Sequence, residues 1–181
     1  MDLSLDPVVA HATASALAAV FLLAGIGKLR EPDSFQAAVE GYELLPSPVV
    51  RALVWLLPLA ELAAGGLLLM TTTRSAGALL ALSLLALFGA AIGTNLLRGR
   101  AGIDCGCGWG PAVPVGPGLL VRNVVLMAAS LLVLLPLSAR ETVWLDLLAA
   151  LFLAVFLFGL NTLATAMLAH HARLLSLRNH P

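Results

Sequence analysis

Long stretches without charged side chains constrain this chain more than any other feature of its sequence. They run from Pro7 to Gly27, from Ala52 to Thr73 with Glu61 as the one interruption, from Ser75 to Leu97, from Asn123 to Ala139 and from Leu147 to Ala169. A helix needs roughly 20 apolar residues to cross a bilayer core about 30 Å thick. The fourth stretch reaches this length if it extends back through Arg122 to Pro117. The sequence therefore predicts an all-α integral membrane protein.

The composition excludes the common soluble classes. Of the 181 residues, 60% are hydrophobic and 11% are charged, against about 45–50% and about 25% in soluble domains. The formal net charge is zero, so no basic surface is available for a nucleic acid. The first stretch lacks a positive segment before it and is followed by Lys28 and Arg30, so we interpret it as a mature helix rather than a signal peptide.

The connections between the stretches indicate how the helices are arranged. We expect one membrane domain over residues 1–181, with helices near residues 7–29, 51–73, 75–97, 117–139 and 143–169. Two of the connections are only a few residues long, which forces antiparallel neighbours and hence a compact bundle of about five transmembrane helices. The segment from Asp33 to Leu44 has an acidic start and spaced apolar residues, which predicts a short amphipathic helix on the membrane surface.

Both cysteines of the chain lie in the glycine-rich connection at residues 98–116, in the sequence Cys105-Gly106-Cys107. A disulfide between cysteines two positions apart closes a very small ring, and strained disulfides are the labile, oxidising kind. The pattern therefore favours exchange: a partner's thiolate attacks one sulfur and the second cysteine resolves the mixed disulfide. The guanidinium groups of Arg98, Arg100 and Arg122 flank this connection and favour a thiolate, whereas Asp104 opposes it.

Two other interpretations of the cysteines stay open at this point. The pair is half of the ligand set that zinc requires, but the histidines are distant in sequence and no further cysteine exists, so no metal is expected. Alternatively, the cysteines are inert small hydrophobes, although a polar glycine-rich loop is an unusual place for them.

Several polar residues are candidates to support the cysteine site. Glu61 is costly inside an apolar helix unless it is paired, protonated or functional, and we expect Lys28 on the preceding helix to be its partner, either as a tie between helices or in proton or cofactor handling. Arg122 and Asn123 follow the cysteine loop and suit a role in holding it, in binding a polar head group or in anchoring the helix at the interface. Trp109 is an interfacial aromatic, a cover for the disulfide, or a surface for a quinone ring.

The order of these motifs resembles the MauE family of methylamine-utilisation proteins, within the wider DoxX-like group of redox-associated membrane proteins. The resemblance covers most of the chain and departs at Trp109, where phenylalanine is expected. It implies a helical membrane bundle that forms or relays disulfides beside a thioredoxin-like partner, for a disulfide-containing client. The motifs that carry it are Gly27-Lys28-Leu29, Pro32, Phe35, Tyr42, Leu44-Leu45-Pro46, Leu57-Pro58 with Glu61, Gly65-Gly66, Cys105-Gly106-Cys107-Gly108 and Arg122-Asn123.

The side of the membrane on which the cysteines lie is predicted differently by two arguments. Eight Lys and Arg residues fall on the side of the cysteine loop and two on the other, which places the loop in the cytoplasm by the positive-inside rule. Disulfides, however, persist outside the cytosol. With the resemblance, we expect a multi-pass protein of the inner (cytoplasmic) membrane with its cysteine loop on the extracytoplasmic side.

Two classes of function follow from the sequence. In the first, Cys105 and Cys107 exchange disulfides with a thioredoxin-like or client protein, and electrons pass to a membrane quinone or to another thiol carrier. In the second, the protein is a non-catalytic membrane assembly or anchoring factor and its cysteines are structural. The strained ring and the glycines favour the first class, although the sequence contains no quinone motif.

Overall fold

The computed structural model describes residues 4–100, 103–106, 113–138 and 142–179, with side chains up to residue 171. This described part contains helices and two isolated β-bridges, and no strand. The prediction of an all-α fold is therefore confirmed. The helices are α1 (Pro7–Arg30), α2 (Pro32–Gly41), α3 (Ser47–Leu69), α4 (Arg74–Leu97), α5 (Pro117–Val133) and α6 (Trp144–Asn179).

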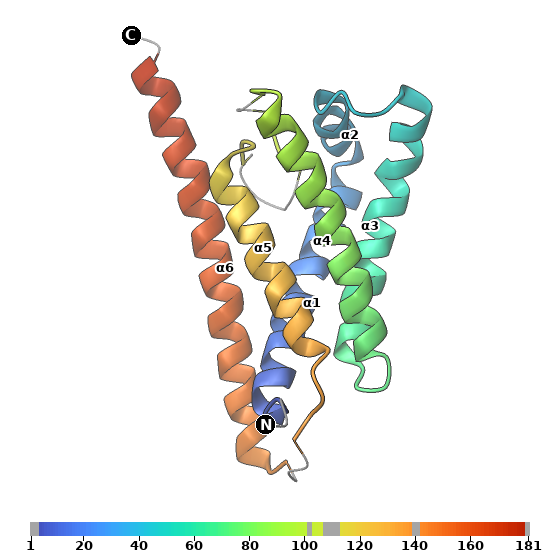
Figure 1. The fold of residues 1–181 in the computed structure, drawn as a ribbon, viewed down its shortest axis with the longest axis vertical. Coiled ribbons are helices and arrows are strands. Elements are labelled where there is room, and N and C mark those ends of the chain that lie inside the picture. Colours follow the sequence, from blue (N-terminus) through green and yellow to red (C-terminus); the bar gives the residue numbers. More distant parts are fainter. Residues whose placement is uncertain (1–3, 101–102, 107–112, 139–141, 180–181) are drawn as a thin grey trace.

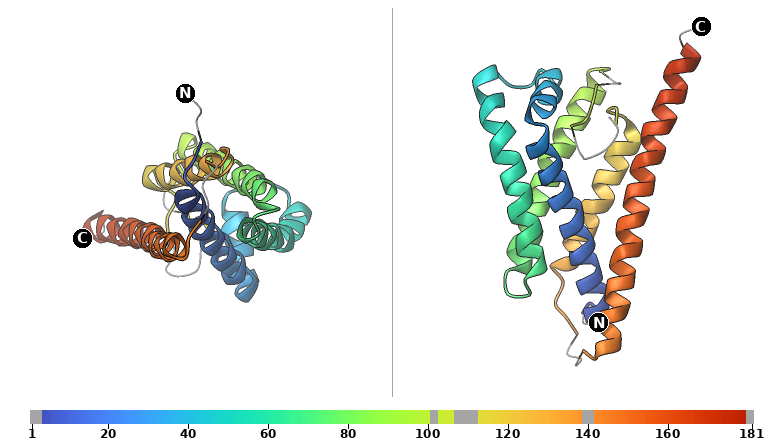
Figure 2. Two further views of the ribbon diagram at one scale, coloured as in Figure 1. Left: turned by 90° about the horizontal axis from the view of Figure 1, so that it is seen from below. Right: turned by 180° about the vertical axis from the view of Figure 1, so that it is seen from behind.

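The five long helices run alternately up and down, and short α2 lies at one end of them (Figure 1). As a result, α2, the connection between α4 and α5 and the C-terminal end of α6 share one end of the bundle. We call this the cysteine end, because Cys105 lies there. The N-terminus lies at the opposite end (Figures 1 and 2).

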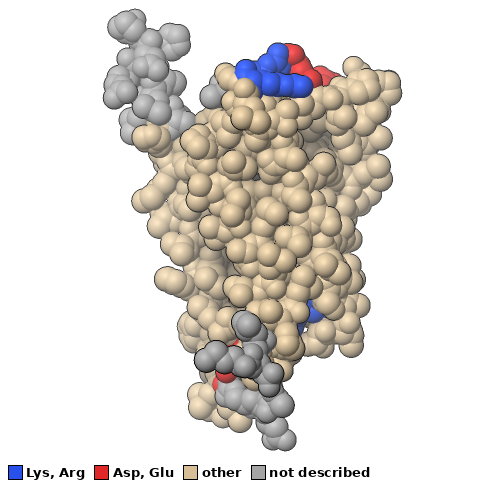
Figure 3. Space-filling model, in the orientation of Figure 1, with Lys and Arg blue, Asp and Glu red and all other residues tan. Residues whose placement is uncertain are grey.

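The outside of the bundle is suited to lipid. Helices α1, α3 and α4 and residues Trp144–His171 of α6 are long and apolar enough to cross a membrane. Figure 3 shows a wide band without visible charge between the charged ends of the molecule. Large apolar side chains of the long helices, such as Leu56, Val121 and Phe152, are more than half exposed, as expected where lipid rather than water is the solvent.

The interior is built on small residues of α1. Ala14 and Ala18 of this helix are buried against Ala64, Ala78 and Ala81 in the largest apolar cluster among the described residues. A Cβ atom at Gly25 would lie 2.9 Å from the carbonyl oxygen of Pro58, and one at Gly65 would lie 2.7 Å from Leu22. Glycine at these positions allows α1 and α3 to approach closely.

Two expected segments end differently in the structure. Helix α5 stops at Val133 instead of continuing to 139, because Pro136 has no N–H and restricts the residue before it. The chain beyond α5 is extended there and forms a parallel bridge between Leu5 and Leu137. The final helix continues to Asn179, past the expected end at 169.

Helix α2 is shorter than the expected segment at residues 33–44. One face of the helix is buried in the protein: Phe35 packs against Val50 and Val54 of α3, and Ala38 is also buried. The chain leaves the helix after Gly41, and Glu43 adopts a φ of 48°, which is left-handed backbone that ends helical propagation. The short helix is therefore amphipathic, with one face packed on the bundle at the cysteine end and the other exposed.

Candidate functional site

The cysteine end carries a small hairpin, which we define as residues 103–106 and 113–115 and call the cysteine hairpin. The backbone N–H of Cys105 donates to the carbonyl of Val113 at 2.9 Å, and the N–H of Val115 donates to the carbonyl of Ile103 at 2.8 Å. Cys105 is 7% exposed and packs in an apolar cluster between this hairpin, α4 and α5. It does not carry a free thiol. The predicted site residues Cys107 and Trp109 lie outside the described residues.

Tyr42 fixes the backbone of Cys105. Its hydroxyl donates to the carbonyl oxygen of Cys105 at 3.2 Å, across 63 residues of sequence. Burial, and second the negative charge of Asp104, raise the pKa of Tyr42 to about 12. The phenol therefore stays protonated, and able to donate this hydrogen bond, throughout the physiological range.

The raised pKa of Tyr42 predicts how the stability of the protein changes at alkaline pH. Because the pKa is about 12 in the folded state and about 10 when unfolded, the protein should lose stability as pH rises from about 10 to 12, and not below. Tyr42 is the only tyrosine, so near-ultraviolet absorbance of tyrosinate reports it alone. A titration midpoint near the unperturbed value would contradict the contact, and Tyr42→Phe should remove both the absorbance change and the alkaline loss.

Gly106 joins the cysteine hairpin to α2. Its φ is +62°, a conformation that glycine adopts without steric cost. A Cβ atom here would lie 3.0 Å from Cβ of Ala38 and 3.2 Å from the ring of Phe35. The N–H of Gly106 donates to the carboxylate of Asp104 at 3.2 Å. The glycine between the cysteines is thus required both by its backbone conformation and by its packing.

A comparison of two glycines separates these requirements. Gly99 also has a positive φ, +70°, but a Cβ atom there meets nothing within 4 Å. Gly99→Ala should therefore cost only the left-handed backbone penalty, about 1–2 kcal/mol, whereas Gly106→Ala should cost more because it also pushes against α2. The two variants are compared by chemical unfolding in detergent, and equal losses would show that the contact with α2 is unimportant.

The expected partnership of Lys28 and Glu61 is confirmed. The ammonium of Lys28 donates to both carboxylate oxygens of Glu61, at 2.7 and 2.8 Å, and the two side chains are 3% and 2% exposed. The pair lies one helical turn beyond Gly25 on α1 and one turn beyond Pro58 on α3, where the two helices are closest. The close approach of the backbones brings the two charges together and excludes lipid from them.

Phe35 connects this buried ion pair to the cysteine hairpin. The ammonium of Lys28 lies 5.4 Å from the centre of the Phe35 ring and 5.6 Å from that of Phe88, within cation–π range. The Phe35 ring also lies close to Gly106, where an added Cβ atom would be 3.2 Å from the ring. Phe35 therefore lies between the Lys28–Glu61 pair and Gly106, the neighbour of Cys105 in the chain.

A cavity of about 540 Å³ lies beside this set. It is bounded by α1, α2, α5, α6 and the cysteine hairpin, and Lys28, Gly106 and Arg122 are among its lining residues. The Nε of Arg122 donates to Oδ1 of Asn161 on α6 at 3.0 Å. Arg122 is thus half-buried in the cavity wall.

Asn123 has a different role from the one expected. Its amide donates to the carbonyl oxygen of Leu85 on α4 at 2.6 Å, and it is buried. Gly89 on α4 makes room for it, because a Cβ atom there would lie 2.7 Å from the amide nitrogen. Asn123 therefore ties α5 to α4 inside the bundle rather than holding the cysteine loop.

One of the arginines expected to flank the cysteines, Arg100, has a carboxylate partner. Arg100 pairs with Glu43 at the exposed surface, and this hydrogen bond and charge lower the pKa of the Glu43 carboxyl.

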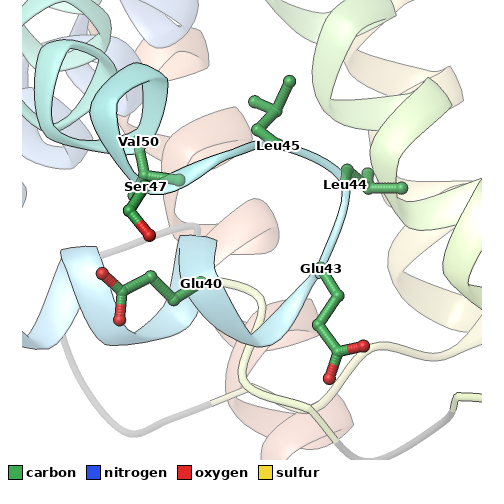
Figure 4. A pocket seen from close by; sticks show the side chains of 6 residues that line it. All are labelled: Glu40, Glu43, Leu44, Leu45, Ser47 and Val50. Carbon is green, nitrogen blue, oxygen red and sulfur yellow. The ribbon is translucent and has the colours of Figure 1, made fainter.

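A second pocket, of about 450 Å³, lies at the connection between α2 and α3 (Figure 4). Its lining residues are Glu40, Glu43, Leu44, Leu45, Ser47 and Val50. No candidate catalytic side chain lines that pocket.

Tyr42, Phe35 and Asn161 contribute to the site in ways that the sequence did not indicate. Tyr42 and Phe35 stand in the sequence as motif residues of a short amphipathic segment, and Asn161 as a lone polar residue in the last span. Nothing in the sequence signals that the first two meet residues 105 and 106, or that Asn161 meets Arg122, since each contact joins distant segments.

Comparisons with known proteins agree with this arrangement of motifs. The family described as "Methylamine utilisation protein MauE" matches residues 6–136, which include the cysteine hairpin and exclude α6. The chain is 37% identical to the methylamine utilization protein MauE of Paracoccus denitrificans over 131 residues, 72% of this chain and 70% of the relative. It is 38% identical to that of Paracoccus versutus over 127 residues, 70% and 68% of the two chains. No solved structure matches the chain.

Proposed function

The chain belongs to the MauE family, and from that premise we propose that it forms or relays disulfide bonds in the membrane through Cys105 and Cys107. The oxidised cysteine pair receives two electrons from the dithiol of a thioredoxin-like partner or of a client protein. The partner leaves with a new disulfide, and the pair is left as two thiols. A contribution to methylamine utilisation, named for the family, is part of the same proposal.

The observation that carries the proposal is the state and place of Cys105. It does not carry a free thiol, and it lies at the end of the bundle rather than in the middle of the lipid-facing band. The only other cysteine in the sequence is Cys107, so the pair is the one source of redox chemistry that the chain's own residues offer.

Burial assigns the two sulfurs different roles in this proposal. Cys105 is 7% exposed behind Tyr42, Ile92 and Leu119, which hinders attack by another protein. We therefore assign the attacked sulfur to Cys107 and the leaving thiol to Cys105. Attack on Cys107 forms a mixed disulfide with the partner and releases Cys105 as a thiol. The partner's second thiol then attacks its own sulfur in the mixed disulfide, which closes the partner's disulfide and releases Cys107 as a thiol.

Trapping experiments test this assignment. In Cys105→Ser cells, the thiolate of Cys107 can still attack the disulfide of an oxidised partner, but Cys105 is absent and cannot release the mixed disulfide. A covalent complex should therefore accumulate, seen on non-reducing gels and lost with reductant. Cys107→Ser is the matched control and should accumulate little or none. Trapping through Cys105 instead would reverse the roles, and the absence of a complex in both variants would contradict disulfide exchange.

Burial of Cys105 also favours a second candidate function. A cysteine packed against apolar side chains, with its backbone bonded on both sides, is typical of a structural residue. In that case the protein is a membrane assembly or anchoring factor that holds its partners without redox turnover. It would then support maturation of its clients in Cys105→Ala cells, whereas the redox proposal requires failure.

For the location, we propose the inner membrane with the cysteine end outside the cytoplasm. Lys28 is buried and Arg122 lines a cavity, so neither is a topology signal, although six of the eight basic residues at this end remain. The extracytoplasmic placement rests on the persistence of disulfides there. An impermeant thiol reagent should label reduced cysteines in intact cells, and labelling only after the cells are opened would reverse the orientation.

A further inference from the structure

The cavity beside the cysteine hairpin is a candidate ligand site. Its two walls are helical faces, with Val20 and Leu23 on α1 opposite Phe158 and Ala166 on α6. Figure 2 shows that α6 diverges from the other helices towards the cysteine end. The resulting wedge is lined by residues of α2, the hairpin and the apolar helices α1 and α6, and a volume of about 540 Å³ is within the range of small-molecule sites.

The charges around the cavity indicate a neutral ligand. Lys28 is occupied by both oxygens of Glu61. The remaining basic lining residues, Arg30 and Arg122, are matched in number by Glu31 and Asp104. A site for a phosphate or carboxylate needs an excess of positive charge, and this lining does not supply one.

The hydrogen-bonding groups that line the cavity indicate a ligand that accepts hydrogen bonds. The hydroxyls of Thr162 and Thr165 already donate to the carbonyls of Gly159 and Asn161 in their own helix. Arg122 uses its Nε on Asn161, and among the described residues its two terminal nitrogens have no hydrogen-bond partner. A neutral, lipid-soluble molecule with carbonyl oxygens fits donors placed at the polar end of an apolar wedge.

We propose that this cavity binds the ring of an isoprenoid quinone, which accepts the electrons collected by the cysteines. Gly106 lines the cavity and is bonded directly to both cysteines in the chain, so the site adjoins the redox pair. The two thiols of Cys105 and Cys107 lose two electrons and two protons and form a disulfide. The quinone gains both electrons and both protons and becomes a quinol.

This inference rests on the proposed disulfide function but uses residues that the family match does not contain. The α6 wall lies beyond residue 136, where the match ends. A substitution on α6 therefore changes the proposed quinone site without touching the cysteine hairpin, and allows the two proposals to be tested separately.

The test uses two substitutions on the same helix. Ala166→Phe fills the cavity from the α6 wall, whereas Leu163→Phe adds an aromatic at a residue that is 53% exposed and lines no part of the cavity. Equilibrium binding of a short-chain ubiquinone is measured on full-length protein in detergent. Ala166→Phe should weaken binding by about tenfold or more, and Leu163→Phe should leave it unchanged.

A second readout follows the chemistry. The purified protein is reduced, freed of reductant and mixed anaerobically with the same quinone, and quinol formation is followed by absorbance. The parent and Leu163→Phe should convert one quinone per cysteine pair, and Ala166→Phe should be slower while still exchanging disulfides with a thioredoxin-like protein. Disulfide exchange without saturable quinone binding, or binding equal in both variants, overturns this inference and leaves the proposed function standing. Binding without any disulfide exchange contradicts the proposed function instead.

Discussion

Cys105→Ser and Cys107→Ser are each expected to abolish disulfide formation in the client while the bundle stays inserted and folded. Either substitution leaves one sulfur, and a single cysteine cannot form the intramolecular disulfide that takes two electrons from a dithiol. The hairpin lies at one end of the molecule, and the main apolar cluster on α1, α3 and α4 does not include it. The loss of function should therefore be complete, whereas the loss of stability should be small.

Client oxidation is measured by the redox state of the client in cells, and folding by circular dichroism and thermal unfolding of the purified variants. Because Cys105 is buried, serine there places a hydroxyl in an apolar cluster. Cys105→Ala avoids that cost and serves as the matched variant, and should be equally inactive. Normal client oxidation by any of the three variants refutes the redox function.

Glu61→Ala is expected to be the most damaging single change in α3. It leaves the ammonium of Lys28, with 3% of its side chain exposed, without its carboxylate. Removing one partner of a buried ion pair typically costs about 3–5 kcal/mol, because the remaining charge is neither solvated nor paired. The free energy of unfolding, measured by denaturant titration in detergent, should fall by about this amount.

Two further variants distinguish a structural tie from a functional pair. Glu40→Ala is the control, since the exposed carboxylate of Glu40 accepts a hydrogen bond from Gln36 of its own helix, and it should change stability little. The double variant Lys28→Met, Glu61→Leu removes both charges and should recover most of the stability. Recovered stability with lost client oxidation would assign the pair a functional role, whereas recovery of both would limit it to holding α1 against α3.

The pairing of Lys28 with Glu61 was predictable from the sequence because the physics left few alternatives. A carboxylate in the middle of an apolar helix requires a cation, and consecutive antiparallel helices bring the end of the first beside the second. The hydrogen-bond partner of Asn123 was not predictable, for the opposite reason. An amide has many acceptors within reach, and the space made by Gly89 on α4 decided which carbonyl it meets.

The sequence by itself determined that this is a membrane bundle of alternating helices with its cysteines at one end, because hydrophobic length and short connections allow few other folds. Only the tertiary structure decided what surrounds the cysteines. The contacts of Tyr42 and Phe35 with the hairpin, and the wedge beside Arg122, depend on how α2 folds back and how far α6 tilts. Such geometry is set by packing between distant segments, and the hydrophobic pattern within one helix carries no information about it.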